Sequence, residues 1–238
     1  MEIDKGAASP GGPQALGGPF GAIGNWVAAG AAKVKQATKA ATEKVLDTVG
    51  DFASTKVLAW TREPLNENLS RFFGDVFVYM DSRGDKTAPG PIPAHILSEW
   101  DKAIAAAPAG EPILIIGHSL GGVISYDLLT HFRPDLQVDL FVSVGSQVSH
   151  FEEMKLFKSS DRRIPGAGGT KVPKPANIKN WINVFDVVDI FSYSCRDIFD
   201  SVVDFGYDTN TYVIKAHGAY FEQSRFYERL RARMNALP

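Results

Sequence analysis

The chain has 238 residues, a formal net charge of −2, and ordinary shares of apolar (45%) and charged (22%) side chains. This length suits one α/β domain with or without a small appendage. A near-neutral charge gives no electrostatic reason to expect nucleic acid or an anionic membrane as a partner. Cys195 is the only cysteine, which excludes an intrachain disulfide and a cysteine-based metal cluster.

The sequence carries no recognisable membrane or secretory signal. No apolar run approaches the roughly 20 residues that cross a bilayer. The first residues, MEIDKGAASP, lack the basic start and the compact apolar core of a signal peptide. We therefore expect a soluble, cytoplasmic protein.

The N-terminal part of the chain differs in composition from the rest. Residues 6–24 are rich in Gly, Pro and Ala and bury too little surface to offset their ordering entropy, so we expect flexibility there. Residues 25–48 are rich in Ala and Lys and predict a helix with a thin apolar stripe. This helix is either peripheral or membrane-binding, and the weak stripe favours the peripheral alternative. We expect residues 1–50 to form this appendage and residues 51–238 to form the main domain.

Beyond Gly74, apolar runs alternate with helical patterns. DVFVYM (75–80) predicts a buried strand, and residues 93–107 predict a helix that begins at a proline. ILII (113–116) predicts a second strand, and residues 120–131 predict a second helix. The Gly-, Pro- and Lys-rich stretch 158–177 has no regular pattern and is either a solvated loop or a flap over a site.

The C-terminal half continues the alternation. Further strands are predicted at VDLFVSVGS (138–146), WINVF (181–185) and TYVI (211–214), and a last helix at 221–234. Apolar strands alternating with helices favour an α/β fold of three layers, in which a mostly parallel sheet has helices on both faces.

The stretch GHSLGG joins the strand ILII to the helix that follows. A serine on a sharp strand-to-helix turn is typical of a nucleophile elbow, in which its hydroxyl projects from the carboxyl end of the strand. Gly117 and Gly121 flank Ser119 where we expect a Cβ to clash. The backbone N–H of Leu120 is the candidate oxyanion donor. A phosphate-binding loop requires a different glycine pattern, whereas a purely structural turn is the open alternative.

Four segments together resemble a known family. GHSLGGVISYDLL, VDLFVSVGSQV, WINVFDVVD and AHGAYF are similar to segments of the α/β-hydrolase superfamily, especially its lipase- and esterase-like serine hydrolases. The resemblance extends from Gly74 to about Leu230. It implies a Ser-His-Asp triad and no metal or organic cofactor.

The resemblance also implies the partners of Ser119. In this family the chain order is Ser, then Asp or Glu, then His. His217, in the turn KAHGAY before the last helix, stands at the position of the base. Asp189 and Asp186 both follow the strand WINVF, and the pattern Asp-Ile-Phe favours Asp189 as the acid. We expect His95, His131 and His150 to be structural or solvated. His118, beside the serine on the sharp turn, is expected to point elsewhere and not to act as the base.

The loop after the strand WINVF that carries Asp186 and Asp189 is called the acid loop below. Three further aspartates follow this loop, and one lies in the helix after Ser119. We expect Asp197, Asp200 and Asp204 on a solvated or capping face, and Asp127 on the helix surface.

These residues predict a serine hydrolase that cleaves carboxylic esters, with lipids among the candidate substrates, through an acyl-enzyme. A transacylase and a weakly active or non-catalytic binding or scaffold protein are the alternatives. The family's upstream His-Gly oxyanion loop has no counterpart before Ser119. The chain is therefore N-terminally shortened, uses a donor such as a backbone amide of residues 82–84, or has little activity. Missing strands would expose a sheet edge and apolar helix faces, which either the N-terminal Ala/Lys-rich helix or a second copy of the chain would cover. The second alternative makes a homo-oligomer a hypothesis.

Overall fold

The structure, a computed structural model, describes residues 70–164 and 169–237. Its contacts divide the chain into two compact units, Met1–Met80 and Asp81–Pro238. The predicted flexible segment 6–24, the predicted helix 25–48 and the predicted boundary between residues 50 and 51 all lie outside the described residues.

The first described element corrects the sequence analysis. Residues 70–82 form a helix, so the predicted buried strand at 75–80 is wrong. Phe72, Val76 and Tyr79 are spaced at i, i+4 and i+7, which also fits one face of a helix. A short apolar run does not distinguish a strand from a helix segment by periodicity alone.

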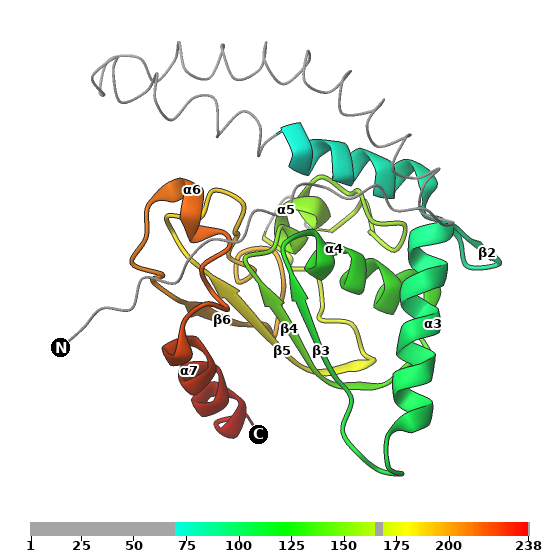
Figure 1. The fold of residues 1–238 in the computed structure, drawn as a ribbon. Coiled ribbons are helices and arrows are strands. Elements are labelled where there is room, and N and C mark those ends of the chain that lie inside the picture. The colour runs from blue at the N-terminus through cyan, green and yellow to red at the C-terminus, as the bar shows by residue number, and fades with distance from the viewer. Residues whose placement is uncertain (1–69, 165–168, 238) are drawn as a thin grey trace, which may run out of the picture. The chain divides into compact units, whose positions relative to one another are not determined.

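A parallel sheet of four strands forms the centre of the second unit (Figure 1). Its order is β3 (Leu114–His118), β4 (Val138–Val144), β5 (Ile178–Phe185) and β6 (Val203–Gly206), and every neighbouring pair is parallel. The strands predicted at 113–116, 138–146 and 181–185 are confirmed as β3, β4 and β5. The second unit is therefore of the α/β class.

Helices and a small hairpin surround this sheet. The helices are α3 (Pro91–Ala106), α4 (Leu120–Asp127), its π-helical continuation η1 (Leu128–Phe132), α5 (Val148–Glu153), α6 (Val213–Ala216) and α7 (Ser224–Asn235). The hairpin pairs β1 (Gly84–Asp85) with β2 (Ala88–Pro89).

Two elements near the C-terminal half differ from the sequence prediction. TYVI, predicted as a strand, contributes instead to the short helix α6. The fourth strand of the sheet is β6, whose sequence VDFG places an aspartate in a strand and was not predicted. Hydrogen bonds to that aspartate compensate its low strand propensity, as described below.

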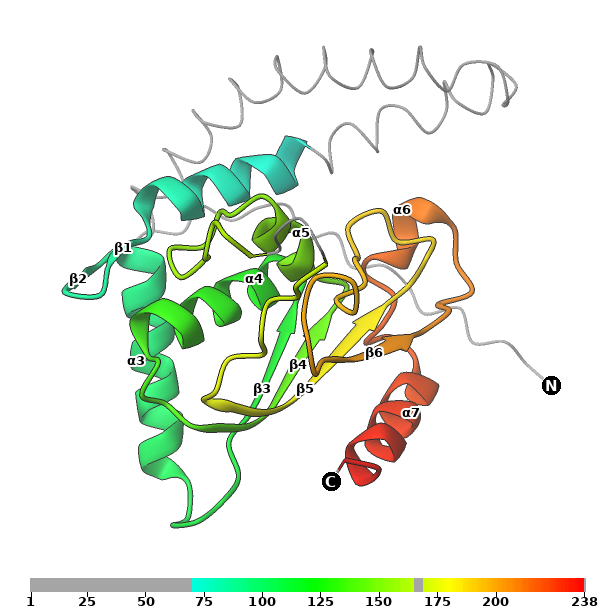
Figure 2. The ribbon, with the colours of Figure 1, turned by 180° about the vertical axis from the view of Figure 1, so that it is seen from behind.

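The two faces of the sheet bury different sets of side chains. On one face Val142, Ile182 and neighbouring strand residues form a core cluster with Phe226 and Leu230 of α7. Successive side chains of a strand point to opposite faces. The other face therefore carries Trp181, whose ring lies 5.5 Å from that of Tyr126 in α4. The helices α7 and α4 can be followed on either side of the sheet in Figures 1 and 2.

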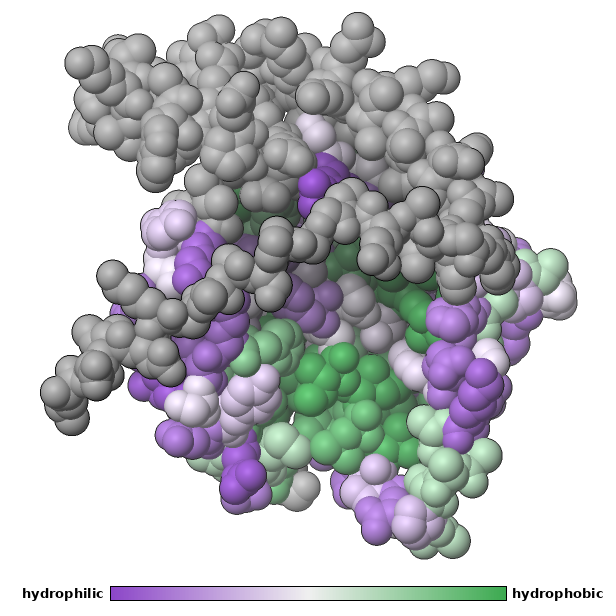
Figure 3. All heavy atoms as spheres, in the orientation of Figure 1, coloured by the Kyte–Doolittle hydropathy of each residue, from purple (hydrophilic) through white to green (hydrophobic). Residues whose placement is uncertain are grey.

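Strand β3 forms one edge of the sheet as far as the described residues show, with β4 as its partner strand. Leu114 and Ile116 lie on the same face as Leu140 and Val142 of β4, yet they are 44% and 52% exposed. Figure 3 shows apolar side chains gathered over this part of the sheet. An exposed apolar edge fits the expectation of self-association, which stays a prediction.

Candidate active site

The sequence-predicted site residues meet at the end of the sheet where the carboxyl ends of the parallel strands lie. Ser119 follows β3, Asp189 follows β5, and His217 follows α6, so all three lie beyond the carboxyl ends of the strands. In open parallel sheets this end is where loops converge and where ligands bind. The sequence places these residues far apart, and the parallel topology brings them together.

Ser119 has a strained backbone that its neighbours hold in place. Its φ of 54° and ψ of −129° are unusual for a residue with a side chain. Its N–H donates to the carbonyl of Val144 over 2.9 Å. Its own carbonyl accepts from the hydroxyl of Ser146 over 2.8 Å. A strained conformation persists only where the surroundings impose it, and clusters at functional sites.

The glycines around the elbow have different roles from those expected. A Cβ at Gly117 would lie 2.6 Å from the Cα of Gly122, and a Cβ at Gly122 would lie 2.4 Å from the hydroxyl oxygen of Ser146. A Cβ at Gly121, by contrast, would meet nothing within 4 Å. The expected clash is therefore confirmed at Gly117 and wrong at Gly121, and the close approach of strand and helix requires Gly122 as well.

His217 lies within hydrogen-bond distance of both predicted partners. Its Nε2 is 2.7 Å from the Oγ of Ser119, and its Nδ1 is 2.9 Å from Oδ2 of Asp189. Because a carboxylate accepts but does not donate, Nδ1 carries a proton and Nε2 is the free acceptor for the serine hydroxyl. This is the arrangement that lets an imidazole remove a proton from a serine.

Asp189 is fully buried and is surrounded by donors. Besides the imidazole, Oδ2 accepts from the hydroxyl of Tyr220 over 2.9 Å, and Oδ1 accepts from the N–H of Phe191 over 2.9 Å. Burial, followed by the charge of Asp189, raises the pKa of Tyr220 far above its ordinary value, so the phenol keeps its proton. These donors stabilise the negative charge of the carboxylate and fix its orientation.

Asp186, the alternative acid, faces other partners. One of its oxygens accepts from the N–H of Val188 over 2.9 Å. The other accepts from both the N–H and the hydroxyl of Thr209, over 2.8 Å and 2.7 Å. Asp186 thus connects the acid loop to the segment after β6, and the carboxylate that contacts the imidazole is Asp189.

The candidate oxyanion donor lies at the start of α4. Leu120 is the first residue of α4, and the first N–H groups of a helix have no acceptor within it. The alternative donor segment, residues 82–84, is held elsewhere. Arg83 forms an ion pair of 2.9 Å with Asp127, and the adjacent Asp85 bonds to His131. Both partners lie in the later turns of α4 and in η1, away from the turn at Ser119.

The site includes three residues whose role the sequence did not indicate. They are Tyr220, which bonds to Asp189, Ser146, which bonds to the carbonyl of Ser119, and His118, which bonds to the carbonyl of His217. Tyr220 follows the base by three residues in AHGAY, and this closeness in the chain is the one sequence signal that could have identified it. The other two contacts arise only when distant segments approach.

Two aspartates expected at the surface are buried. Asp127 has a side-chain exposure of 0% and is paired with Arg83. Asp204 of β6 is 3% exposed and accepts hydrogen bonds from residues on β5 and on the loop after it: Asn183, Ser194, Cys195 and Arg196. The expected surface position of Asp127 is therefore wrong. At Asp204 the solvated alternative is wrong, whereas the bonds from the N–H groups of Cys195 and Arg196 fit the capping alternative. In both cases fixed donors replace water around the carboxylate. The exposed Asp197 and Asp200 fit the expectation.

Other titratable groups lie outside this arrangement. His131 bonds to Asp85 over 2.7 Å, and the ring of His150 stacks on Tyr193 at 4.8 Å. Cys195 is buried, and burial raises the pKa of its thiol. In the residues that the structure describes, no group of three or more potential ligands could hold a metal ion.

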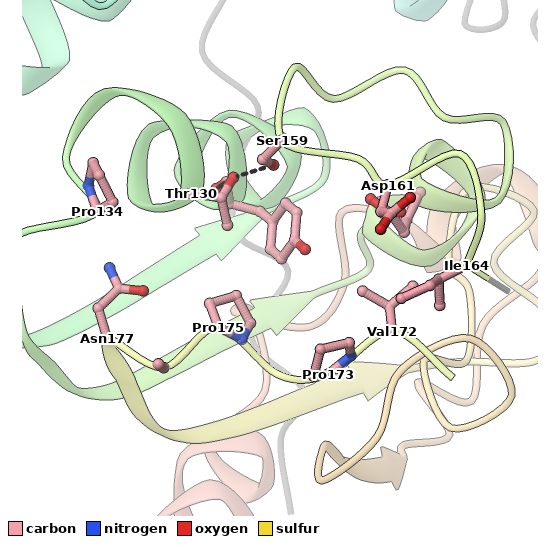
Figure 4. A pocket seen from close by; sticks show the side chains of 12 residues that line it. Thr130, Pro134, Ser159, Asp161, Ile164, Val172, Pro173, Pro175 and Asn177 are labelled. Carbon is pink, nitrogen blue, oxygen red and sulfur yellow. Dashed lines mark hydrogen bonds between the residues drawn. The ribbon is translucent and has the colours of Figure 1, made fainter. Parts of the chain in front are cut away.

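A cavity of about 420 Å³ is lined by η1 and by parts of the predicted loop 158–177 (Figure 4). Several of its polar side chains are already paired: Thr130 with Ser159, Asp161 with Arg163, and Asn177 with the carbonyls of Leu129 and Leu136. No triad residue lines it.

No helix within the described ranges is both long and apolar enough to cross a membrane. In comparisons with known proteins, no family model, no curated protein and no solved structure matches the chain.

Proposed function

We propose that the protein is a serine hydrolase of the α/β-hydrolase type that cleaves carboxylic esters. One observation carries the proposal: Ser119, on a strained turn between a parallel strand and a helix, is 2.7 Å from the Nε2 of His217, whose Nδ1 is 2.9 Å from buried Asp189. A structural turn needs neither the imidazole nor the carboxylate behind it.

The geometry supports a two-step acyl transfer. The Oγ of Ser119 attacks the ester carbonyl carbon while its proton passes to Nε2 of His217, and Asp189 stabilises the resulting imidazolium. The N–H of Leu120 donates to the oxyanion. The bond to the leaving alkoxide then breaks, and the alkoxide takes the proton from Nε2. Water then attacks the acyl carbon and gives a proton to Nε2 of the same imidazole. The bond between the acyl carbon and Oγ breaks, Oγ takes the proton back from Nε2, and the acid is released with Ser119 regenerated.

The surroundings of the triad favour an apolar acyl or alkyl group in the substrate. The ring of Phe191 lies 4.9 Å from that of His217, and Val187 and Ile190 on the same loop are exposed. An apolar ring next to the base, on a loop with further exposed apolar side chains, would bind the apolar part of an ester by the hydrophobic effect. A series of p-nitrophenyl esters of increasing chain length would measure this preference as kcat/KM.

The proposal is tested by labelling with a serine-reactive fluorophosphonate. We expect the wild type to be labelled and Ser119→Ala to be unlabelled. Ser201→Ala is the matched control, because Ser201 is also a serine at positive φ, 60°. We expect it to label like the wild type. Absence of labelling in the folded wild type would favour the non-catalytic scaffold alternative.

Turnover of an ester substrate tests cooperation within the triad. Ser119→Ala and His217→Ala are each expected to lower kcat by about three orders of magnitude or more, and the double variant by no more than either. Comparing hydrolysis with transfer to an added alcohol separates a hydrolase from a transacylase. The cytoplasmic location and the homo-oligomer remain predictions.

A further inference from the structure

His118 is the last residue of β3 and directly precedes the nucleophile. Its Nε2 lies 2.8 Å from the backbone carbonyl oxygen of His217, and the two imidazole rings have centroids 4.9 Å apart. A carbonyl oxygen only accepts hydrogen bonds, so Nε2 of His118 carries the proton and donates it. Two consecutive residues, His118 and Ser119, therefore bind the same histidine at different points.

The segment that carries His217 has little regular structure of its own. His217 follows α6, a helix of four residues, and is followed by the exposed Gly218. Helices this short are not stable by themselves. The hydrogen bond from His118 ties the main chain of this segment to β3, a strand within the sheet. It therefore fixes the base relative to the strand that presents the nucleophile.

The surroundings of His118 suit a neutral donor. Its ring contacts those of Tyr220 and Phe221, at centroid distances of 6.1 Å and 5.5 Å. Burial lowers the pKa of His118 below its ordinary value, and the nearby His217 lowers it further, against the opposing effects of the hydrogen bond to the carbonyl of His217 and the charge of Asp189. The donor role needs only the Nε2–H, which the neutral ring supplies.

We propose that His118 is a positioning residue: its Nε2–H, bonded to the carbonyl of His217, holds the imidazole of His217 at hydrogen-bond distance from Ser119. This inference rests on the proposed function of the triad. Misplacing a reacting group by about 1 Å costs roughly a hundred-fold in rate. Loss of the tether is therefore expected to reduce the reactivity of Ser119 without changing the triad itself.

A pair of amide substitutions isolates the hydrogen bond. In His118→Gln the side-chain amide nitrogen occupies about the position of Nε2 and keeps a donor for the carbonyl. In His118→Asn the amide is one methylene shorter and does not reach it. The probe is the fluorophosphonate, and the measured quantity is kinact at saturating probe. Because an unfolded molecule does not react, kinact reports on the folded fraction alone.

We expect His118→Asn to lower kinact by about 10- to 100-fold with an unchanged half-saturating probe concentration. His118→Gln is expected to stay within about threefold of the wild type. His150→Gln, at a half-exposed histidine outside the site, is the control and should match the wild type.

The outcomes separate this inference from the proposed function. An unlabelled wild type overturns the proposed function. A labelled wild type with equal kinact in the Asn and Gln variants overturns the positioning role while the triad stands. A kinact that is low in both variants also overturns the role of the Nε2–H donor. Only a low value in Asn with rescue in Gln supports it, whatever the melting temperatures of the variants.

Discussion

At the residue scale, two carboxylates of one loop have separate tasks because their oxygens face different donors. Asp189 contacts the imidazole of His217 together with the hydroxyl of Tyr220, whereas Asp186 contacts amide and hydroxyl donors of Val188 and Thr209. Asn has nearly the same shape as Asp but carries no negative charge. Replacing either aspartate by Asn therefore removes its charge-dependent contacts and keeps the shape of the loop. The two substitutions thus measure catalysis and loop structure independently.

We expect Asp189→Asn to lower kcat by about a thousand-fold or more, because an amide no longer fixes the Nδ1–H tautomer or stabilises the imidazolium. Asp186→Asn is expected to lower the melting temperature and to have the smaller effect on kcat. Both quantities can be measured on the same preparations with a p-nitrophenyl ester. A larger loss of kcat at Asp186 would reverse the assignment of the acid.

The sequence predicted the three residues of the candidate triad but not the hydrogen bonds that surround them. The elbow at Ser119 depends on neighbours in the chain, and the positions of His217 and Asp189 follow from a family's chain order. The hydrogen bonds of His118 and Ser146 could not be foreseen, because each joins segments far apart in sequence. An imidazole and a hydroxyl at these positions fit many environments equally well.

At the element scale, the prediction succeeded where apolar runs were bounded by clear turns and failed where the pattern was ambiguous. Strands β3, β4 and β5 were found from their apolar segments ILII, VDLFVSV and WINVF, although β5 begins three residues before the last of these. Residues 75–80 fit a strand and a helix equally, and neighbouring residues extend the helical alternative to 70–82. Strand β6 was missed because its aspartate is compatible with a strand only when specific donors satisfy it.

The elbow allows a matched test of its packing. Gly121 and Gly122 are adjacent in α4, but only a Cβ at Gly122 would clash, at 2.4 Å from the hydroxyl oxygen of Ser146. We expect Gly122→Ala to destabilise the fold by about 1–3 kcal/mol through overpacking. Gly121→Ala should instead stabilise it by about 0.5–1 kcal/mol, because Ala suits a helix better than Gly.

Thermal unfolding measures both changes. For a chain of this size, about 1 kcal/mol corresponds to a shift of roughly 2–4 °C in the melting temperature. The two variants should therefore shift in opposite directions. Equal destabilisation by both would mean that helix and strand approach each other differently from the geometry described above.

At the scale of the whole molecule, the carboxylate of Asp204 joins three segments of the second unit: β5, the loop after β5, and β6. Its carboxylate on β6 accepts a hydrogen bond from Asn183 of β5 over 2.8 Å and another from Ser194, in the loop between β5 and β6, over 2.6 Å. Burial raises the pKa of Asp204, but these hydrogen bonds, with those from the N–H groups of Cys195 and Arg196, outweigh it and keep the pKa below its ordinary value. The ionised form is thus part of the folded state.

This depression of the pKa fixes the sign of a pH effect. A carboxyl whose pKa is lower in the folded than in the unfolded state contributes stability above its unfolded pKa, about 3.9. The contribution is lost as the pH falls through the folded value. We expect Asp204→Asn to lower the free energy of unfolding at pH 7 by about 2–3 kcal/mol. The difference from the wild type should shrink as the pH is lowered below about 4.

Urea unfolding at pH 7 and at pH 3 measures this difference. Asp197→Asn is the control, because Asp197 is exposed, and it should change the free energy of unfolding little at either pH. A difference between Asp204→Asn and the wild type that is as large at pH 3 as at pH 7 would mean that the charge of Asp204 is not what stabilises the fold. In that case the acceptor oxygen that Asn replaces with an NH2 group, and not the charge, would account for the loss. The junction of β5, β6 and the loop after β5 would then depend on neutral hydrogen bonds instead of on ionised ones.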